Sequence, residues 1–347
     1  MAIKLWFNRW FSTVTHYIEM IRENPDRQSF IIHGTHSNPD AVYLNSCDVS
    51  GIEPDVNGEE YLEFCLDYCR QNQIDVFIPR KENVMISRQL KRFQEIGVKV
   101  LVCPDGDLMA LLDNKVSMYR SLEEKMLEGH AIVPLPAYRI VRTADEFKQA
   151  YAELAAQGME LCLKPVVGEG ANGFWVLDEI ADTIQFLFNT ASSRKISYAS
   201  AYKLLQQQRE FPDLMILEYL DGFEYSIDCL ADGEGNLYTA IPRKKGNGRI
   251  REIEYNEELL EIARKIAQHY KIPYVFNIQV KYKDGVPKLL EINPRMSGGL
   301  HISCLSGVNV PYYAVKLLLK GTIEPLYPNF GIKATHIEQA VVLSREL

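Results

Sequence analysis

The first hundred residues alternate between the two-residue period of a strand and the 3.6-residue period of a helix, and this constrains the fold more than any other feature. Strands separated by helices need crossover connections, so the alternation predicts a parallel sheet covered by helices. The pattern is Rossmann-like, but it contains no GxGxxG and therefore predicts no dinucleotide site. The expected strands are Ile3 to Phe7, Phe30 to His33, Val76 to Ile78 and Val98 to Cys103. The expected helices are Ser12 to Glu23, Glu59 to Gln71 and Arg88 to Ile96.

The rest of the chain predicts an α+β arrangement built largely from antiparallel strands. A long amphipathic helix, Met109 to Leu127, is expected first. Three further helices are expected at Ala144 to Gln157, Glu257 to Tyr270 and Val310 to Leu319. The expected strands of a small unit are Tyr138 to Val141, Leu161 to Pro165, Gly173 to Leu177 and Met215 to Tyr219. The expected hairpins pair Tyr225 to Ala231 with Leu237 to Pro242, and Phe276 to Tyr282 with Val286 to Ile292.

Length and composition exclude several classes of protein. A chain of 347 residues suits two or three linked domains. A formal charge of -8 argues against a nucleic-acid partner, although it leaves room for a local basic cleft that binds phosphates. The seven cysteines show no zinc-binding spacing and fit reduced thiols. No run reaches the ~18 apolar residues of a membrane span. We therefore expect a cytoplasmic protein that contacts neither nucleic acid nor membrane.

The run Glu291-Ile292-Asn293-Pro294-Arg295 ends a predicted strand and carries the most specific chemistry in the sequence. Residues two apart on a strand share a face, so Glu291 and Asn293 point together, as do Asn277 and Gln279 on the preceding strand. Carboxylate and amide oxygens are hard ligands that suit Mg²⁺ bound together with nucleotide phosphates. The pattern predicts a magnesium site; the alternative is a half-buried strand whose polar face is merely solvated.

The turn between these two strands decides whether the two pairs of side chains meet. A two-residue turn, Asp284-Gly285, places Asn277 and Glu291 on opposite faces of the hairpin. A three-residue loop that also includes Lys283, with the glycine left-handed, sets Asn277 opposite Glu291. We predict the three-residue loop, because it gathers the four oxygen-bearing side chains at one point.

A glycine-rich loop follows the expected strand that contains Lys164. Its glycines, Gly168, Gly170 and Gly173, let backbone N–H groups approach phosphate oxygens and adopt positive φ. The loop lies between two strands and lacks the Lys-Ser/Thr of a P-loop. We interpret it as a phosphate-covering loop, and the alternative is an ordinary flexible hairpin.

The segment from Pro242 to Arg251 is basic and allows two interpretations. It is either a solvated loop or a cationic arm that contacts the γ-phosphate or the acceptor carboxylate. Arginine suits bidentate recognition of both groups, so we favour the second interpretation for Arg243 and Arg249. Gly298 and Gly299 follow the metal run, and their backbone donors are candidates for facing the reacting carboxyl. His301 is given no role.

These motifs resemble those of the ATP-grasp superfamily, in its carbamoyl-phosphate-synthetase and biotin-carboxylase-like branch. Residues 291–295 match its Glu-x-Asn-Pro-Arg segment, in which the Glu and Asn bind Mg²⁺ and the Arg meets transferred phosphate or substrate. The resemblance therefore implies Glu291 and Asn293 as metal ligands, Gln279 as a third, and Arg295 as a catalytic residue.

The resemblance extends backward in the family's order, over roughly residues 108 to 320. It implies that Lys115 and Lys164 hold nucleotide phosphates and that the glycine-rich loop is the lid over them. Glu218-Tyr219-Leu220 resembles the hinge that holds adenine, and Glu224 resembles the ribose-binding acid. On their own, Lys115 and Glu224 would be interpreted as solvated surface residues.

The resemblance also implies a domain order. It places a Rossmann-like pre-ATP-grasp domain over residues 1–107 and a linking helix over 108–132. The ATP-grasp fold follows, with a small lid subdomain over 133–220 and a large antiparallel-sheet subdomain over 221–347.

The activity implied by the resemblance is that of a carboxylate–amine ligase. Such an enzyme uses ATP with two Mg²⁺ ions, for which Mn²⁺ is an alternative, forms an acyl phosphate, and releases ADP and phosphate. Its partners would be a small-molecule carboxylate and an amine, and a homodimer is compatible with the family. Two alternatives stay open: a kinase that phosphorylates a small-molecule hydroxyl, and a nucleotide-binding regulatory protein without turnover.

Overall fold

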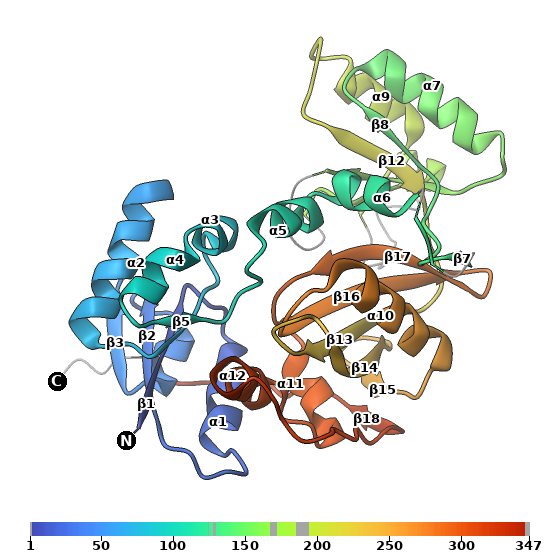
Figure 1. Cartoon of the computed structure of the whole chain (residues 1–347). Helices are drawn as coiled ribbons and strands as arrows, with labels where there is room; N and C mark the ends of the chain where they lie inside the picture. Colours follow the sequence, from blue (N-terminus) through green and yellow to red (C-terminus); the bar gives the residue numbers. More distant parts are fainter. Residues whose placement is uncertain (1, 124, 128–129, 167–171, 185–193, 344–347) are drawn as a thin grey trace. The chain divides into compact units, whose positions relative to one another are not determined.

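The computed structural model describes residues 2–123, 125–127, 130–166, 172–184 and 194–343, which form two compact units (Figure 1). The first unit comprises Met1–Leu112, Phe223–Val280 and Glu291–Leu347. The second unit comprises Asp113–Gly222 and Lys281–Leu290. The division into four parts that the sequence indicates stays a prediction.

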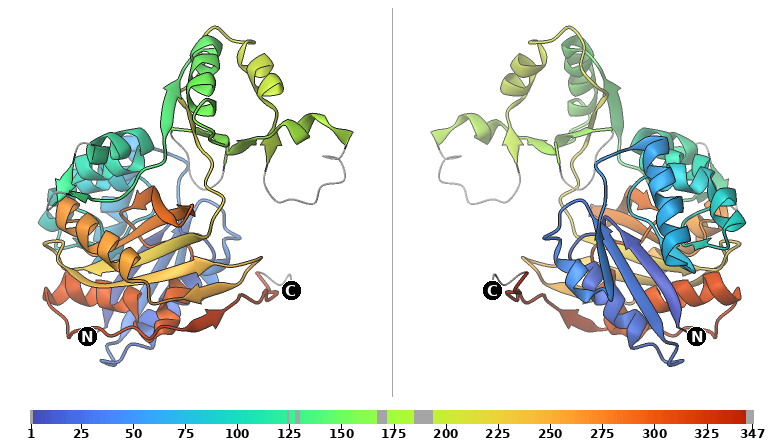
Figure 2. Two further views of the ribbon diagram at one scale, coloured as in Figure 1. Left: turned by 90° about the vertical axis from the view of Figure 1, so that its right-hand side faces the viewer. Right: turned by 90° about the vertical axis from the view of Figure 1, so that its left-hand side faces the viewer.

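The first unit begins with a five-stranded parallel sheet, as the alternating periods predict (Figure 2). One of its edge strands, with the sequence VSGI, was not expected, because this sequence shows no apolar alternation. Most of its residues are exposed in the structure. In spatial order the strands are β3 (Val49–Ile52), β2 (Phe30–His36), β1 (Ile3–Asn8), β4 (Val76–Ile78) and β5 (Lys99–Val100). The helices around it are α1 (Val14–Arg22), the 3-10 helix η1 (Val42–Ser46), α2 (Gly58–Asn72), α3 (Asn83–Arg88) and α4 (Leu90–Glu95).

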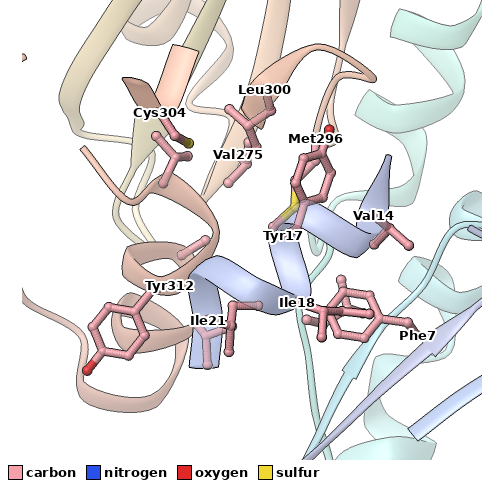
Figure 3. Packing of buried hydrophobic residues seen from close by; sticks show 14 of the residues in the cluster. Phe7, Val14, Tyr17, Ile18, Ile21, Val275, Met296, Leu300, Cys304 and Tyr312 are labelled. Carbon is pink, nitrogen blue, oxygen red and sulfur yellow. The ribbon is translucent and has the colours of Figure 1, made fainter. Parts of the chain in front are cut away.

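Side chains of the parallel sheet alternate between two faces, and a separate apolar core covers each face. Trp6 and Phe77 pack with the buried residues of α2. Phe7 packs with α1 on the other face, where Tyr17 reaches the residue that follows the metal run, Met296 (Figure 3). The period-two pattern of β1 thus places one helix layer on each side of the sheet.

The first unit also contains a six-stranded sheet in the order β17-β16-β13-β14-β15-β18. Its main helix is α10, which begins after the capping side chain of Asn256 and ends at Lys271, in the left-handed region. The strands are β13 (Glu224–Ala231), β14 (Leu237–Lys245), β15 (Arg251–Ile253), β16 (Val275–Lys283), β17 (Val286–Asn293) and β18 (Ile332–Ala334). The helices are α10 (Glu257–Tyr270), α11 (Leu300–Ser303), the 3-10 helix η3 (Cys304–Ser306) and α12 (Val310–Lys320).

The hairpin of β16 and β17 turns over two residues, so the three-residue loop predicted above is wrong. β16 extends to Lys283 and β17 begins at Val286. Both residues between them are left-handed, Asp284 with φ 50° and Gly285 with φ 79°. Positive φ at both central residues is the type I′ turn, whose twist matches that of the flanking strands. Aspartate tolerates this conformation, since its short polar side chain bonds locally.

The regular alternation of β17 breaks inside the strand. Leu289 and Ile292 are both buried, with two half-buried residues between them. The Tyr119 hydroxyl lies 2.8 Å from the carbonyl oxygen of Leu289 and 3.2 Å from that of Leu290. Successive carbonyls of a regular strand point in opposite directions, so this double contact marks a local irregularity. An extra residue here would shift Glu291 to the opposite face from the one that a regular hairpin gives it.

The second unit is built on a five-stranded sheet in the order β11-β10-β9-β12-β8. Two helices, α7 and α9, cover one face of it through a core that includes Phe147, Leu163 and Ile216 (Figure 1). The strands are β8 (Tyr138–Val141), β9 (Leu161–Pro165), β10 (Trp175–Leu177), β11 (Lys195–Ile196) and β12 (Leu214–Glu218). The helices are α7 (Ala144–Ala155), the 3-10 helix η2 (Glu179–Asp182) and α9 (Tyr198–Leu205), and a small ribbon pairs β6 (Met126–Leu127) with β7 (His130–Ala131).

The single long helix expected from Met109 to Leu127 is wrong. The chain forms two helices, α5 (Gly106–Asp113) and α6 (Lys115–Glu123), separated at Asn114. The Asn114 side chain accepts hydrogen bonds from the N–H groups of Val116 at 3.1 Å and Ser117 at 3.0 Å. Asparagine competes with the helix backbone in this way, so it starts a new helix here.

No single helix in the described ranges is long and apolar enough to cross a membrane. Leu300–Ser306 and Val310–Lys320 pass that test only as a pair, which is bent by 90°. All seven cysteines are free thiols and six of them are buried, in agreement with the absence of zinc-binding spacing.

Two left-handed glycines offer a matched test of backbone packing in the first unit. At Gly235, φ is 79° and an added Cβ would lie 2.3 Å from the carbonyl carbon of Lys271, at the end of α10. At Gly97, φ is 78° and no heavy atom lies within 4 Å of such a Cβ. We expect Gly97→Ala to cost ~1–2 kcal/mol of unfolding free energy, from backbone strain alone. Gly235→Ala should cost ~1–3 kcal/mol more, because it also displaces backbone.

Urea unfolding of the two variants, followed by a probe in the first unit, measures this difference. Equal losses of stability would show that the turn after β13 is not held against α10.

Candidate functional site

The metal run has the geometry that its strand period predicts. The Asn293 side-chain amide donates to Glu291 Oε1 at 2.9 Å, so the two side chains lie on the same face of β17. The Arg295 N–H donates to the Asn293 carbonyl at 2.8 Å, which turns the chain directly after the strand. Glu291, Asn293 and Arg295 are all half-buried, so each retains access to solvent.

Asn277 and Gln279 were expected to join Glu291 and Asn293 in one cluster, but Asn277 lies in a different environment. Asn277 and Gln279 share a face of β16, since the Gln279 amide lies 3.4 Å from Asn277 Oδ1. Asn277 is fully buried, however, and its amide donates to Asp228 Oδ1 at 2.8 Å. Asn277 therefore belongs to a buried polar network and not to an open cluster of four metal-binding side chains. The meeting of Gln279 with Glu291 stays a prediction.

The donors on the run fit a magnesium ion. Glu291 supplies a carboxylate, and Asn293 supplies an amide oxygen, because its nitrogen faces Glu291. The described part of the chain holds no group of three or more His, Cys, Asp or Glu side chains arranged for a metal. A metal bound here would take its remaining ligands from amides, water and nucleotide phosphates, which is the usual coordination of Mg²⁺ in nucleotide-dependent enzymes.

A buried carboxylate, Asp228 on β13, organises the residues around the run, and the sequence interpretation missed it. Its Oδ1 accepts from the Ser297 hydroxyl at 2.7 Å and from the Asn277 amide at 2.8 Å. Its Oδ2 accepts from the Ser303 hydroxyl at 2.6 Å and from the Arg243 guanidinium at 3.2 Å. With four partners, a fully buried charge is compensated in the way that burial demands.

Arg243 is the cationic partner of this network and not part of a loop. It lies on β14 with 3% of its surface exposed, and its Nε donates to the Ser303 hydroxyl at 3.0 Å. A Cβ on Gly299 would lie 2.6 Å from its guanidinium carbon, so the glycine lets the backbone pass close to the charge. The solvated-loop interpretation is therefore wrong for Arg243, whose contact with phosphate or carboxylate stays a prediction.

Arg249 lies in a different environment. Its side chain is 58% exposed and forms an ion pair with Glu338. The catalytic role predicted for Arg249 stays a prediction, and a ligand at this position would compete with that carboxylate.

The sequence marks Asp228 as unusual, but only the strand pairing identifies its partner. The strand EYSIDCLA places Asp228 among apolar residues. In the observed register Asp228 lies opposite Ile241, and Ser226 lies opposite Arg243. Arg243 is thus the diagonal neighbour of Asp228, within reach of a long side chain. Finding the pair required the register of the hairpin, which composition does not supply.

The second unit presents Lys164 on the face of its sheet opposite the helical core. Lys164 pairs in register with Met215, which pairs in turn with Ile140. The alternate residue Leu163 lies in the core with α7 and α9. Helix α6 covers the Lys164 face, because the Tyr119 ring of this helix lies 5.3 Å from the ring of Tyr138.

A pocket of about 330 Å³ opens between α6 and this sheet face. Its polar lining includes two arginines, Arg120 and Arg142, and the second of these lies 3.0 Å from the Asp213 carboxylate. Asn114 and Ser117, at the start of α6, and the carboxylate of Glu146 also belong to the polar lining. The pocket lies at the end of β9 from which the glycine-rich loop leaves, where anionic groups would meet basic side chains.

The other predicted phosphate contacts are placed only in part. Lys115 is buried at the start of α6, with 5% of its surface exposed. Gly168 and Gly170 lie outside the described residues. Gly173 has φ 74°, and an added Cβ would lie 2.6 Å from Pro165 Cγ, so the end of the loop packs directly on β9. The roles of these residues toward phosphate stay predictions.

The predicted hinge contains a buried ion pair. Both oxygens of Glu218 lie 2.6 and 2.7 Å from the Lys288 amine on β17, and the Ala137 N–H lies 3.2 Å from the same carboxylate. Next along the hinge, the Tyr219 ring lies 5.3 Å from the Lys281 amine, and the side chain of Leu220 is buried.

Glu224, the predicted ribose contact, begins β13 in the first unit. It forms an ion pair with Lys245, its register partner on β14. The adenine and ribose roles of the hinge and of Glu224 stay predictions.

Residues 210–340 match a family model described as an ATP-grasp in the biosynthetic pathway with Ter operon. Residues 210–340 carry an ATP-grasp domain. The matched range contains the hinge, Glu224 and the run from Glu291 to Arg295, whereas Lys115, Lys164 and the glycine-rich loop precede it. The mixed fold class is confirmed, with a parallel sheet followed by antiparallel sheets.

A curated relative resembles the chain over much of its length. The arginine-specific carbamoyl phosphate synthase large chain of Geobacillus stearothermophilus is 25% identical over 277 residues, which are 74% of this chain and 23% of that protein. This chain thus spans about a quarter of the length of that relative.

Two solved structures show the same fold. The biotin carboxylase domain of Hydrogenobacter thermophilus 2-oxoglutarate carboxylase, solved as a dimer with MgADP and bicarbonate, superposes with a TM-score of 0.64 at 15% identity. That superposition covers 96% of this chain and 74% of the other. The L-amino acid ligase of Bacillus licheniformis superposes with a TM-score of 0.61 at 16% identity, covering 92% and 74%.

Asp228→Ala tests the importance of the buried network. The substitution leaves the Arg243 charge buried without its carboxylate, and we expect it to lower the unfolding free energy by ~3–5 kcal/mol. Replacing both partners, as Asp228→Leu with Arg243→Met, should recover part of this loss, because no charge remains buried. Urea unfolding of the single and double variants measures both effects.

Glu257→Ala is a suitable control for this experiment. It removes an ion pair with Arg264 whose side chains are 60% and 51% exposed, and such a pair contributes little to stability. A loss in Asp228→Ala no larger than that of the control would contradict the central place of Asp228.

Proposed function

We propose that this ATP-grasp protein is an ATP- and Mg²⁺-dependent carboxylate–amine ligase that forms an acyl phosphate and releases ADP and phosphate. The observation that carries the proposal is the shared face of Glu291 and Asn293, joined at 2.9 Å, with Arg295 directly after it. Hard oxygen donors beside an arginine suit a magnesium-bound phosphoryl group in transfer.

The relatives support the type of reaction. One is a carbamoyl phosphate synthase large chain, one an L-amino acid ligase, and one a carboxylase domain with MgADP and bicarbonate. The second name is that of a ligase of amino acids, and the third protein was solved with bicarbonate, so both names include a small acid. The identities of 15–25% to these three proteins do not extend to the choice of substrates.

The metal would be held by Glu291 and Asn293, with Gln279 as the predicted third ligand, and two ions would be present. Bound Mg²⁺, or Mn²⁺ in its place, neutralises the charge that develops on the phosphoryl oxygens. Arg295, beside these ligands, would orient the transferred phosphate. Lys115 and Lys164 would hold the other phosphates of ATP. Phosphoryl transfer of this kind needs no covalent bond to the protein.

The reaction balances in two steps. A carboxylate oxygen of the acid forms a bond to the γ-phosphorus, the bond from phosphorus to the bridging oxygen breaks, and ADP leaves. An amine nitrogen then bonds to the acyl carbon, the carbon–oxygen bond to phosphate breaks, and the amine loses a proton. A homodimer of the chain is compatible with this scheme.

Glu291→Gln tests the metal assignment. The substitution removes the only carboxylate of the run while it keeps the size of the side chain. We expect Mg²⁺-dependent ADP release to fall about 100-fold or more, since a metal ion contributes several kcal/mol to stabilisation of the transition state. A screen of acid and amine pairs for ADP release identifies a working pair, and the variant is then assayed with that pair.

Glu324→Gln, at an exposed carboxylate, is the matched control and should keep full activity. Unchanged turnover in Glu291→Gln would contradict the assignment of Glu291 as a metal ligand. Adding hydroxylamine in place of the amine separates the ligase from a kinase, because an acyl phosphate yields a hydroxamate whereas a phosphorylated alcohol does not.

A further inference from the structure

Three histidines meet next to the Asp228 network, in the first unit. The ring of His301, on α11, stacks on that of His16, on α1, with centroids 4.6 Å apart and planes 21° apart. On its other contact, His301 meets His336, which follows β18, edge-on at 5.4 Å. The three rings come from segments far apart in the sequence, so the fold assembles the cluster. The proposed phosphoryl-transfer residues do not include any of them.

The central histidine has an unused polar atom. His301 Nδ1 is buried and has no hydrogen-bond partner among the described residues. A buried nitrogen without a partner is unfavourable, which makes this atom a candidate for contact with a ligand. Described residues also hold no group of His, Cys, Asp and Glu arranged for a metal, so the three rings do not indicate a metal centre.

The charges of three arginines act on His336, and one of these arginines lacks a carboxylate partner. That arginine, Arg251, pairs in register with Ala334, two residues before His336. Arg243 is paired with Asp228, and Arg249 is paired with Glu338. The guanidinium of Arg251, on β15, donates instead to the backbone carbonyls of Ile250 at 2.7 Å and Gly248 at 3.2 Å. No described carboxylate lies within ion-pair distance of Arg251, although the charge of Glu224 opposes the lowering of its pKa by burial. At the exposed edge of the cluster, His16 Nδ1 lies 3.5 Å from the Glu19 carboxylate. Arg251 is therefore the cation of the cluster that no described carboxylate pairs with.

The titration of the cluster agrees with an excess of positive charge. Burial, followed by the charges of His16, His336 and Arg243, lowers the pKa of His301 to about 4, while Asp228 acts in the opposite direction. Burial also lowers the pKa of His336, with Arg251 as the strongest charged contributor. Tyr17, the remaining titratable group against His301, has its pKa raised by burial and stays neutral.

We infer that His301, His336 and Arg251 form a binding site for an oxyanion, the carboxylate or phosphate group of a small-molecule acid, with His16 at its exposed edge. A protonated His301 donates from Nδ1, and Arg251 has further N–H donors in the fork geometry that oxyanions accept. The negative charge offsets the mutual repulsion of the cations.

The inference also deepens the proposed function, on which this part of it rests. His301 lies directly after the Ser297–Gly299 turn, which follows the metal run. In the ligase, the anion would be a second acidic group of the acid substrate, distinct from the carboxylate that is phosphorylated. The substrate class is then a dicarboxylate or a phosphorylated acid.

The sign of the pH dependence follows from the histidines. At neutral pH His301 is uncharged, because its pKa lies well below 7. An anion raises the pKa of a histidine that it contacts, so the complex binds more protons than the free protein. Affinity must therefore rise as the pH falls from 7 to 5, toward the pKa of the anion-bound histidine.

The experiment is a titration of the full chain with sodium sulfate, without nucleotide, followed by NMR of protein labelled at histidine. Sulfate keeps the same charge over this pH range, so changes in affinity report on the protein alone. We expect the pKa of His301 to rise by about two units on saturation, and the dissociation constant to fall about tenfold from pH 7 to pH 5.

Malonate, titrated at pH 7, is the second arm. Tighter binding of malonate than of sulfate favours a dicarboxylate substrate, and the reverse order favours a phosphorylated acid. Unchanged His301 and His336 resonances with both anions overturn the inference.

His301→Gln and Arg251→Gln should each weaken sulfate binding about tenfold or more, whereas His269→Gln, on α10, should leave it unchanged. Unweakened binding in both His301→Gln and Arg251→Gln overturns the inference. Sulfate binding at His301 without ADP release in any screen would contradict the proposed function and support the oxyanion site. ADP release with histidine resonances that do not respond to either anion would contradict the oxyanion site and support the proposed function.

Discussion

The buried ion pair between Arg243 and Asp228 is the interaction on which the candidate site of the first unit depends. The two side chains are 4% and 0% exposed, so neither charge can rely on water. A charge in this setting is tolerated only when its remaining hydrogen-bonding positions are filled. That requirement draws in Asn277 from β16 and two serines, Ser297 and Ser303, from the segment after the metal run. One electrostatic need therefore connects three strands to the segment that follows the metal ligands.

This connection bears directly on where Arg295 can lie. The chain is held at Asn293 by the bond to Glu291, and again at Ser297 by the bond to Asp228. Few residues separate these two points, so the backbone dihedrals between them have little freedom. The Ser297 carbonyl also accepts from the Tyr17 hydroxyl, which ties the segment to the helix layer of the parallel sheet. Such fixing at both ends is what preorganised catalysis asks of a residue that meets a transferred group.

The sequence predicted the features that depend on local patterns and missed those that depend on burial. Period two placed Glu291 and Asn293 on one face correctly, and helical spacing bounded α10 correctly. Local competition by a polar side chain was underestimated twice. Asn114 divided an expected helix, and Asp284 adopted the left-handed turn that shortened an expected loop. Arg243 is basic in composition whether it is solvated or buried, so only the pairing register reveals its partner.

Two of the predicted nucleotide contacts, Glu224 and Glu218, already form ion pairs with lysines. A ligand that binds either carboxylate would have to displace its lysine. Glu224 and Lys245 are 25% and 35% exposed, so water still reaches both charges. Within the proposed function, a ribose hydroxyl that replaced the lysine would leave neither charge fully buried. Glu218 and Lys288 are 7% and 21% exposed, so separating them would leave a carboxylate poorly solvated.

The hinge backbone therefore suits adenine better than the carboxylate of Glu218 does. The N–H groups of Glu218 and Tyr219 already donate to Ala137 at 2.9 Å and Glu160 at 2.7 Å. The next N–H, that of Leu220, has no hydrogen-bond partner within the described ranges. Within the proposed function, Leu220 would supply the hydrogen bond to adenine, and the Glu218 carboxylate would act as a brace that keeps the hinge in position to give it.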